Sequence, residues 1–306
     1  MFVFAIVYLI SFIVVFSFDE WFLVWVGMEM NMFSFISMVF SKDSWSSLES
    51  LFKYFFIQGL SSGTFLVMMY MGLGLEYPLM MKMAAGPFFF WFPSVMMGIG
   101  WMECFLLMTF QKLIPLFLMS GMVSVLFMFW GVVGMMIGVA GSYGQQMVSC
   151  LMAYSSVNHI GWMMTCFVMK ENLWMFYYVL YMLVVGMLIL YLYDSKIENL
   201  SGMKWIDMMI FFVLVMSMGG IPPMLGFVMK WVVLESMIEV SVVISFIMVF
   251  SSLVMIYIYM RMIYEEMMDG GIWMSWESMN LYKLGGLSWM SLIGTFFVPF
   301  IVWSFM

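Results

Sequence analysis

Long apolar runs alternate along this chain with polar or turn-rich separators. A transmembrane helix needs about 20 apolar residues. Measured against that length, the sequence predicts about eleven transmembrane helices, near residues 2–18, 21–40, 51–75, 79–99, 101–119, 121–141, 147–168, 173–193, 205–236, 242–264 and 285–305. The separators are short except for the one that begins at Glu265. We therefore expect a single integral membrane domain over residues 1–306, folded as an all-α, polytopic transmembrane helix bundle.

Two of these runs contain residues that interrupt helices. The run at 205–236 is too long for one crossing and holds Gly219-Gly-Ile-Pro-Pro223 in its middle. Proline removes a backbone N–H donor and clashes with the preceding turn. The run at 79–99 carries Gly86-Pro87 just after Lys82. Broken helices at membrane depth line cavities, and pairs of them point to transporter sites, so we expect two discontinuous helices, with an ordinary proline kink as the alternative.

The composition agrees with a membrane protein and excludes several functions. Hydrophobic residues make up 66% of the chain and charged residues 9%, whereas soluble domains carry about 25% charged residues. A net charge of −7 argues against nucleic acid as a partner. One histidine and three cysteines without a Cys-x-x-Cys pair do not assemble a zinc or iron–sulfur site. We therefore expect no metal or cofactor on this chain.

Three ionisable side chains, those of Glu29, Lys112 and Lys230, lie deep inside apolar runs. Each charge costs roughly 2.5–3.5 kcal/mol in the centre of a membrane helix. Charge maintained at that cost usually marks an ion or proton path, so the sequence predicts a transporter or pump subunit. The alternatives are a neutral, hydrogen-bonded carboxyl at Glu29 and a structural ion pair with a glutamate at Lys112.

Three further residues are weaker candidates for the same path. Lys82 is close to the start of its run, so its position alone does not bury it. Lys53 lies near a helix start, from which a lysine can extend its ammonium to the membrane surface. His159 adds a titratable ring beside hydroxyl and amide side chains, although a lone histidine is more often structural.

Several strings of the sequence, taken together, are typical of one known family. In chain order they are Trp25-Val-Gly-Met-Glu-Met-Asn31, Phe52-Lys-Tyr-Phe55, Met81-Lys82 leading to Gly86-Pro-Phe88 and Phe90-Trp91, Gln111-Lys-Leu-Ile-Pro115, Ala153-Tyr-Ser-Ser-Val-Asn-His-Ile-Gly-Trp162, and Gly219-Gly-Ile-Pro-Pro-Met-Leu-Gly-Phe-Val-Met-Lys-Trp231. With them the chain resembles the mitochondrial NADH-ubiquinone oxidoreductase chain 2 family, the antiporter-like membrane subunits of respiratory complex I.

The resemblance implies a role for each buried charge. Glu29 matches the family's buried glutamate, which pairs with a lysine at the break of the next discontinuous helix, here Lys82. Lys112 matches the central relay lysine and Lys230 the lysine of the second broken helix. Members of the family are thought to pass protons along this polar row, driven by quinone reduction elsewhere in the complex.

The same resemblance implies the cellular setting. The chain is expected to be a multi-pass core subunit of H⁺-translocating NADH:ubiquinone reductase in the mitochondrial inner membrane. Its partners are then the lipid bilayer and the other membrane subunits, while NADH, FMN, iron–sulfur clusters and ubiquinone bind other subunits. The chain departs from the family pattern in carrying Phe89 for a histidine, Ser94 for an acidic residue, and Ser149-Cys150 for a basic pair.

Two other functions remain open from the sequence. The first is a free-standing cation/proton antiporter of related ancestry. The second is a non-conducting structural subunit that retains its charges as ion pairs, which the departures from the family pattern favour.

Overall fold

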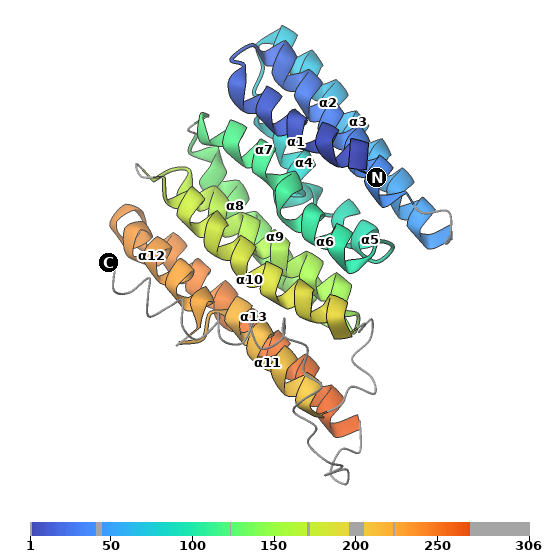
Figure 1. Cartoon of the computed structure of the whole chain (residues 1–306). Coiled ribbons are helices and arrows are strands. Elements are labelled where there is room, and N and C mark those ends of the chain that lie inside the picture. The colour runs from blue at the N-terminus through green and yellow to red at the C-terminus, as the bar shows by residue number, and fades with distance from the viewer. Residues whose placement is uncertain are drawn as a thin grey trace. The chain divides into compact units, whose positions relative to one another are not determined.

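The computed structural model describes residues 2–40, 45–122, 124–169, 172–195, 205–222 and 224–269. Within them the chain forms thirteen α-helices and one short 3-10 helix, which confirms the expected all-α fold (Figure 1). The helices are α1 (Phe2–Ser17), α2 (Trp21–Val39), α3 (Trp45–Met71), α4 (Glu76–Met83), η1 (Gly86–Phe88), α5 (Trp91–Met96), α6 (Trp101–Met108), α7 (Phe110–Ser120), α8 (Leu126–Ser142), α9 (Val148–Cys166), α10 (Leu173–Ser195), α11 (Trp205–Gly219), α12 (Leu225–Val240) and α13 (Val242–Asp269).

The expected apolar runs coincide with these helices, apart from 285–305, which lies outside the described residues. Four described stretches are long and apolar enough to cross a membrane: Trp21–Val39, Trp101–Ser120, Leu173–Ser195 and Val242–Tyr264. Helix α3 begins at Trp45, six residues before the apolar run predicted from residue 51, because its first turns are polar but also helical. Ser50 Oγ, for example, donates to the Ser47 carbonyl of the same helix at 2.7 Å.

The first compact unit runs from Met1 to Trp130. Its helices make a connected set of contacts, in which α1 packs on α2, α2 on α3, α3 on α4 and α5, and α4 on α7. Helix α2 lies close to α1 at Gly27, where an added Cβ would be 2.7 Å from the Val15 side chain. The short helix α4 therefore has neighbours in both α3 and α7, and it carries Lys82.

The second compact unit begins at Gly131, within α8. Helix α10 contacts α9, α11 and α12, and α13 contacts α11 and α12. Small residues bring α8 against α9, since an added Cβ on Gly131 would be 2.9 Å from the Gly161 carbonyl oxygen, and one on Gly138 would be 2.8 Å from the Asn158 amide nitrogen. Such close backbone approach is the usual role of small residues between membrane helices.

The two expected interruptions are both present. The run at 79–99 divides into α4, η1 and α5, and the backbone is left-handed at Ala84 (φ 59°) and Gly86 (φ 56°). The run at 205–236 divides between α11 and α12, where Gly220 (φ 85°) turns the chain. Glycine adopts this conformation without a Cβ penalty. Pro223, on which the prediction of this break also depended, lies outside the described residues.

A third interruption lies in the run at 101–119, which the sequence predicted as one continuous helix. Thr109, with φ −113° and ψ −88°, separates α6 from α7. Its hydroxyl donates to the Phe105 carbonyl at 2.6 Å, a bond that often bends helices. Pro115, four residues after Gln111, offers no N–H to the Gln111 carbonyl. Lys112 therefore lies in the first turn of a new helix rather than in the middle of a long one.

Candidate functional site

Lys82 lies in the last turn of α4, directly before the first break, and only 8% of it is exposed. Three carbonyls at this helix end find donors. Ala85 N–H donates to the Met80 carbonyl at 3.0 Å, Trp91 Nε1 to the Met81 carbonyl at 3.1 Å, and Gln58 Nε2 to the Lys82 carbonyl at 3.2 Å. Lys82 is therefore buried although α4, the helix that leads to it, has only 8 residues.

Glu29 lies on α2 and is half-buried. Its carboxylate interacts electrostatically with Lys82, the lysine to which the family resemblance assigns it. The two side chains, both within the described part of the chain, do not form an ion pair within 4 Å. The carboxylate therefore acts on the Lys82 ammonium through the electrostatic field rather than by direct contact.

A small cavity of about 20 Å³ lies beside Lys82. Its polar lining comes from four helices and comprises Asn31, Tyr54, Gln58, Lys82 and Gln111. Tyr54 donates its hydroxyl to Gln111 Oε1 at 3.2 Å, while the buried Gln111 Nε2 has no hydrogen-bond partner among the described residues. None of Tyr54, Gln58 and Gln111 was predicted as a site residue from the sequence, although each is a polar residue within an apolar run.

Lys112 lies on α7 with 2% of its surface exposed. Its ammonium lies 4.4 Å from the centroid of the Phe92 ring and has no hydrogen-bond partner in the described part of the chain. The described carboxylates also lie more than 4 Å from it. An unpaired ammonium in an apolar interior is costly, so an ion pair with one of the described carboxylates does not account for Lys112.

Lys230 lies on α12, 5% exposed, and reaches back to the second break. Its ammonium donates to the Gly219 carbonyl, at the end of α11, at 2.6 Å. The carboxyl-terminal end of a helix carries partial negative charge and stabilises a cation. The Trp162 ring lies 5.8 Å from the same ammonium. The broken helix thus supplies the acceptor that an ion-paired glutamate would otherwise supply.

His159 lies on α9 and is 1% exposed. Its Nδ1 shares a 2.7 Å hydrogen bond with the hydroxyl of Tyr177 on α10. The Tyr177 ring stacks on Trp162, with centroids 6.2 Å apart and planes 14° from parallel. Because Trp162 also faces Lys230, the structure brings His159 and Lys230 into one cluster of side chains in the second unit.

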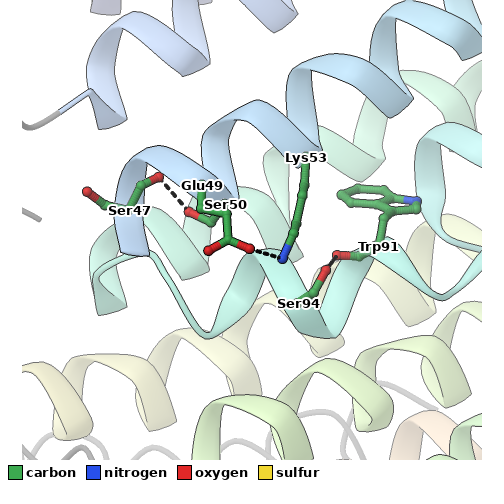
Figure 2. A network of polar contacts seen from close by, with 6 residues as sticks. All are labelled: Ser47, Glu49, Ser50, Lys53, Trp91 and Ser94. Carbon is green, nitrogen blue, oxygen red and sulfur yellow. Dashed lines mark hydrogen bonds and ion pairs between the residues drawn. The ribbon is translucent and has the colours of Figure 1, made fainter. Parts of the chain in front are cut away.

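Lys53 is not among the buried side chains. It is 46% exposed and forms an ion pair with Glu49, one turn earlier on α3, at 2.7 Å (Figure 2). Figure 2 also shows Ser94, at the position where the resemblance implied an acidic residue, with its hydroxyl donating to the Trp91 carbonyl at 2.8 Å. An exposed i,i+4 pair explains Lys53 locally.

The geometry defines a class of protein: a membrane protein with interrupted helices that hold buried lysines, of the antiporter-like type. A family model described as NADH:quinone oxidoreductase/Mrp antiporter, TM, matches residues 67–256. Over 96% of its length the chain is 33% identical to NADH-ubiquinone oxidoreductase chain 2 of Anopheles gambiae, of which it covers 93%. The chain belongs to the NADH-ubiquinone oxidoreductase chain 2 family, which confirms the resemblance found in the sequence.

Solved structures show the same fold at low sequence identity. Respiratory complex I from Thermus thermophilus contains a chain with TM-score 0.72 and 20% identity, matched over 83% of this chain and 67% of that one. The archaeal membrane-bound sulfane sulfur reductase contains one with TM-score 0.81 and 14% identity, matched over 98% and 72%. These matches confirm the prediction of a polytopic transmembrane helix bundle.

Proposed function

We propose that this chain translocates protons as a multi-pass membrane subunit of NADH-ubiquinone oxidoreductase, respiratory complex I, in the mitochondrial inner membrane. The observation that supports this most directly is that Lys82, Lys112 and Lys230 are each buried beside a helix interruption, with the described carboxylates more than 4 Å from all three ammonium groups. Family membership supports the choice of complex. Glu29 and His159 complete the proposed relay, and Lys53 stays a peripheral candidate.

In this proposal the chain works as a core subunit of the enzyme without a redox centre of its own. NADH, FMN, iron–sulfur clusters and ubiquinone bind other subunits, and the neighbouring membrane subunits and the lipid bilayer cover the apolar exterior. That residues 1–306 act as one integral membrane domain is part of the same proposal, and each of the two compact units carries buried lysines of the row.

Helix polarity supports a difference between the lysines. Lys82 lies at the negative, carboxyl-terminal end of α4, and Lys230 binds the carboxyl-terminal carbonyl of α11, so both ammonium groups are stabilised by a helix end. Lys112 lies in the first turn of α7, at a positive helix end, which opposes a cation. We infer that the helix ends favour an ammonium at Lys82 and Lys230 more than at Lys112.

Electrostatic coupling lets protonation pass along such a row. A unit charge 4 Å from another changes its energy by about 4 kcal/mol at an effective dielectric constant of 20. Ionised Glu29 stabilises the Lys82 ammonium, and protonation of Glu29 removes that stabilisation. Loss of the negative charge at Glu29 therefore favours transfer of the Lys82 proton to a neutral Lys112 amine, the next member of the proposed row, which is the proposed elementary step.

Replacement of Lys112 by methionine tests the proposal, because methionine keeps much of the side-chain length without the charge. In membrane vesicles that contain the assembled complex, inhibitor-sensitive NADH oxidation and proton uptake should both fall roughly 100-fold. Lys53→Met, at an exposed and ion-paired lysine, is measured in parallel, and retention of both activities there would exclude Lys53 from the relay.

Each alternative has its own outcome in the same experiment. Normal oxidation and normal proton uptake in Lys112→Met would make the chain a non-conducting structural subunit. Proton uptake driven by a cation gradient in the absence of NADH would instead support a cation/proton antiporter. The amount of assembled complex, measured on native gels, normalises all three activities.

A further inference from the structure

A hydrogen bond, a ring stack and a cation–ring contact connect His159 to Lys230 in the second unit. His159 shares its hydrogen bond with Tyr177, Tyr177 stacks on Trp162, and Trp162 lies 5.8 Å from the Lys230 ammonium. The four residues come from three helices, α9, α10 and α12. Tyr177 is the member that contacts both the imidazole and the indole.

The hydroxyl of Tyr177 shares a hydrogen bond that helps to orient the imidazole, which also lies against the Tyr181 ring at 5.1 Å. At 2.7 Å the bond to Nδ1 is short, and Tyr177 and His159 are 0% and 1% exposed, so bulk water does not compete for it. A hydrogen bond at one ring nitrogen of histidine sets the ring orientation and which nitrogen carries the proton. The direction in which the other nitrogen presents its proton or lone pair therefore depends on Tyr177.

The ring of Tyr177 controls the orientation of the indole. Trp162 is fully buried, and its Nε1 has no hydrogen-bond partner within the described residues. Packing therefore orients the indole, and the nearly parallel Tyr177 ring covers it at 6.2 Å. A lysine ammonium is attracted to the face of an indole within about 6 Å. By stacking on Trp162, the Tyr177 ring therefore keeps the indole in the position that faces Lys230.

We propose that Tyr177 is a positioning residue for proton transfer, which orients His159 through its hydroxyl and holds Trp162 against Lys230 through its ring. The inference rests on the proposed function, because Lys230 and His159 matter here as members of a proton relay. The inference adds two residues, Tyr177 and Trp162, that are uncharged near neutral pH. Their role is to set the positions of the two residues that carry the proton, His159 and Lys230.

Tyr177→Phe separates the two contacts, because it removes the hydroxyl and keeps the stacked ring. The neighbouring Tyr178 offers a matched control, since its hydroxyl is buried and has no hydrogen-bond partner in the described chain. With assembled complex in vesicles, the rate of NADH-driven proton uptake and its solvent deuterium isotope effect are measured. Tyr177→Phe should lower the rate of proton uptake roughly fivefold, the loss expected for one hydrogen bond, and Tyr178→Phe should not.

The isotope effect distinguishes positioning from support of the fold. A misplaced imidazole makes proton transfer the slow step, so the isotope effect should rise in Tyr177→Phe. A merely structural role would lower the rate and leave the isotope effect as in the unchanged chain, and that result would overturn the inference. Equal losses in Tyr177→Phe and Tyr178→Phe would overturn it as well.

A double-mutant cycle tests whether Tyr177 acts through His159. In a His159→Gln background the further substitution Tyr177→Phe should cause no additional loss of proton uptake, because the residue that it orients is already absent. Full additivity of the two losses would contradict the inference. Normal proton uptake in Lys230→Met would instead contradict the proposed function itself. Loss of proton uptake in Lys230→Met together with normal uptake in Tyr177→Phe would contradict only the role of Tyr177.

Discussion

Lys230→Met is expected to lower NADH-driven proton uptake by roughly 100-fold, within the range assigned to positioned acid–base groups. Lys230 is the lysine of the proposed row in the second unit, so its loss leaves no lysine of the row after Lys112. The substitution also removes the donor to the Gly219 carbonyl, and a hydrogen bond from a charged group contributes about 1.5–3 kcal/mol. Reduced thermal stability of the assembled complex should therefore accompany the loss of transport.

Lys230→Arg separates these two effects. Arginine keeps a positive charge and hydrogen-bond donors for the Gly219 carbonyl, but it does not release its proton in proteins. Thermal stability should return toward that of the unchanged complex, while proton uptake stays as low as in Lys230→Met. Proton uptake that recovers with arginine would show that a fixed positive charge suffices at this position, and it would contradict a relay role.

Gly226→Ala is expected to prevent stable assembly of the complex. The residue lies at the start of α12, and an added Cβ would collide with the Ser217 carbonyl oxygen of α11. A backbone oxygen cannot turn away as a side chain can, so the cost should reach or exceed the usual overpacking penalty of about 1–3 kcal/mol. The measurement is the amount of assembled complex on native gels, together with the half-life of its activity at elevated temperature.

Gly63→Ala on α3 is the matched control for this prediction. An added Cβ at Gly63 has no neighbour within 4 Å among the described atoms, and alanine favours a helix over glycine by about 1 kcal/mol. The amount of complex should therefore be unchanged or slightly higher. If Gly226→Ala assembles as well as Gly63→Ala, the close crossing of α11 and α12 does not determine stability.

The helical fold and two of its breaks could be predicted from the sequence because their signals are local. Twenty apolar residues demand a helix in a membrane, and paired glycine and proline residues within a run interrupt it. The break at Thr109 was missed, because it depends on a threonine hydroxyl that binds back to Phe105, and many threonines in helices make no break. The burial of Lys82 was likewise open, since it follows from a left-handed turn at an alanine, Ala84, which rarely adopts that conformation.

The site was predictable only as far as charge in an apolar run could reveal it. Lys112 and Lys230 are buried, as their positions in the sequence suggested. The partners of these charges come from other helices, as the Tyr177 hydroxyl on His159 does at a separation of 18 residues. No local pattern specifies such pairs. Conversely, Lys53 occurs in a family string, but its helix face turns it outward to Glu49. The relay roles themselves stay predictions.

The bond between Lys230 and the Gly219 carbonyl also links charge to backbone shape. The carbonyl belongs to the last residue of α11, directly before the turn at Gly220, where a single φ of 85° redirects the chain. If the ammonium leaves for another acceptor, that helix end loses its donor, and the turn is free to relax. The charge of Lys230 and the backbone geometry at this break therefore depend on one hydrogen bond.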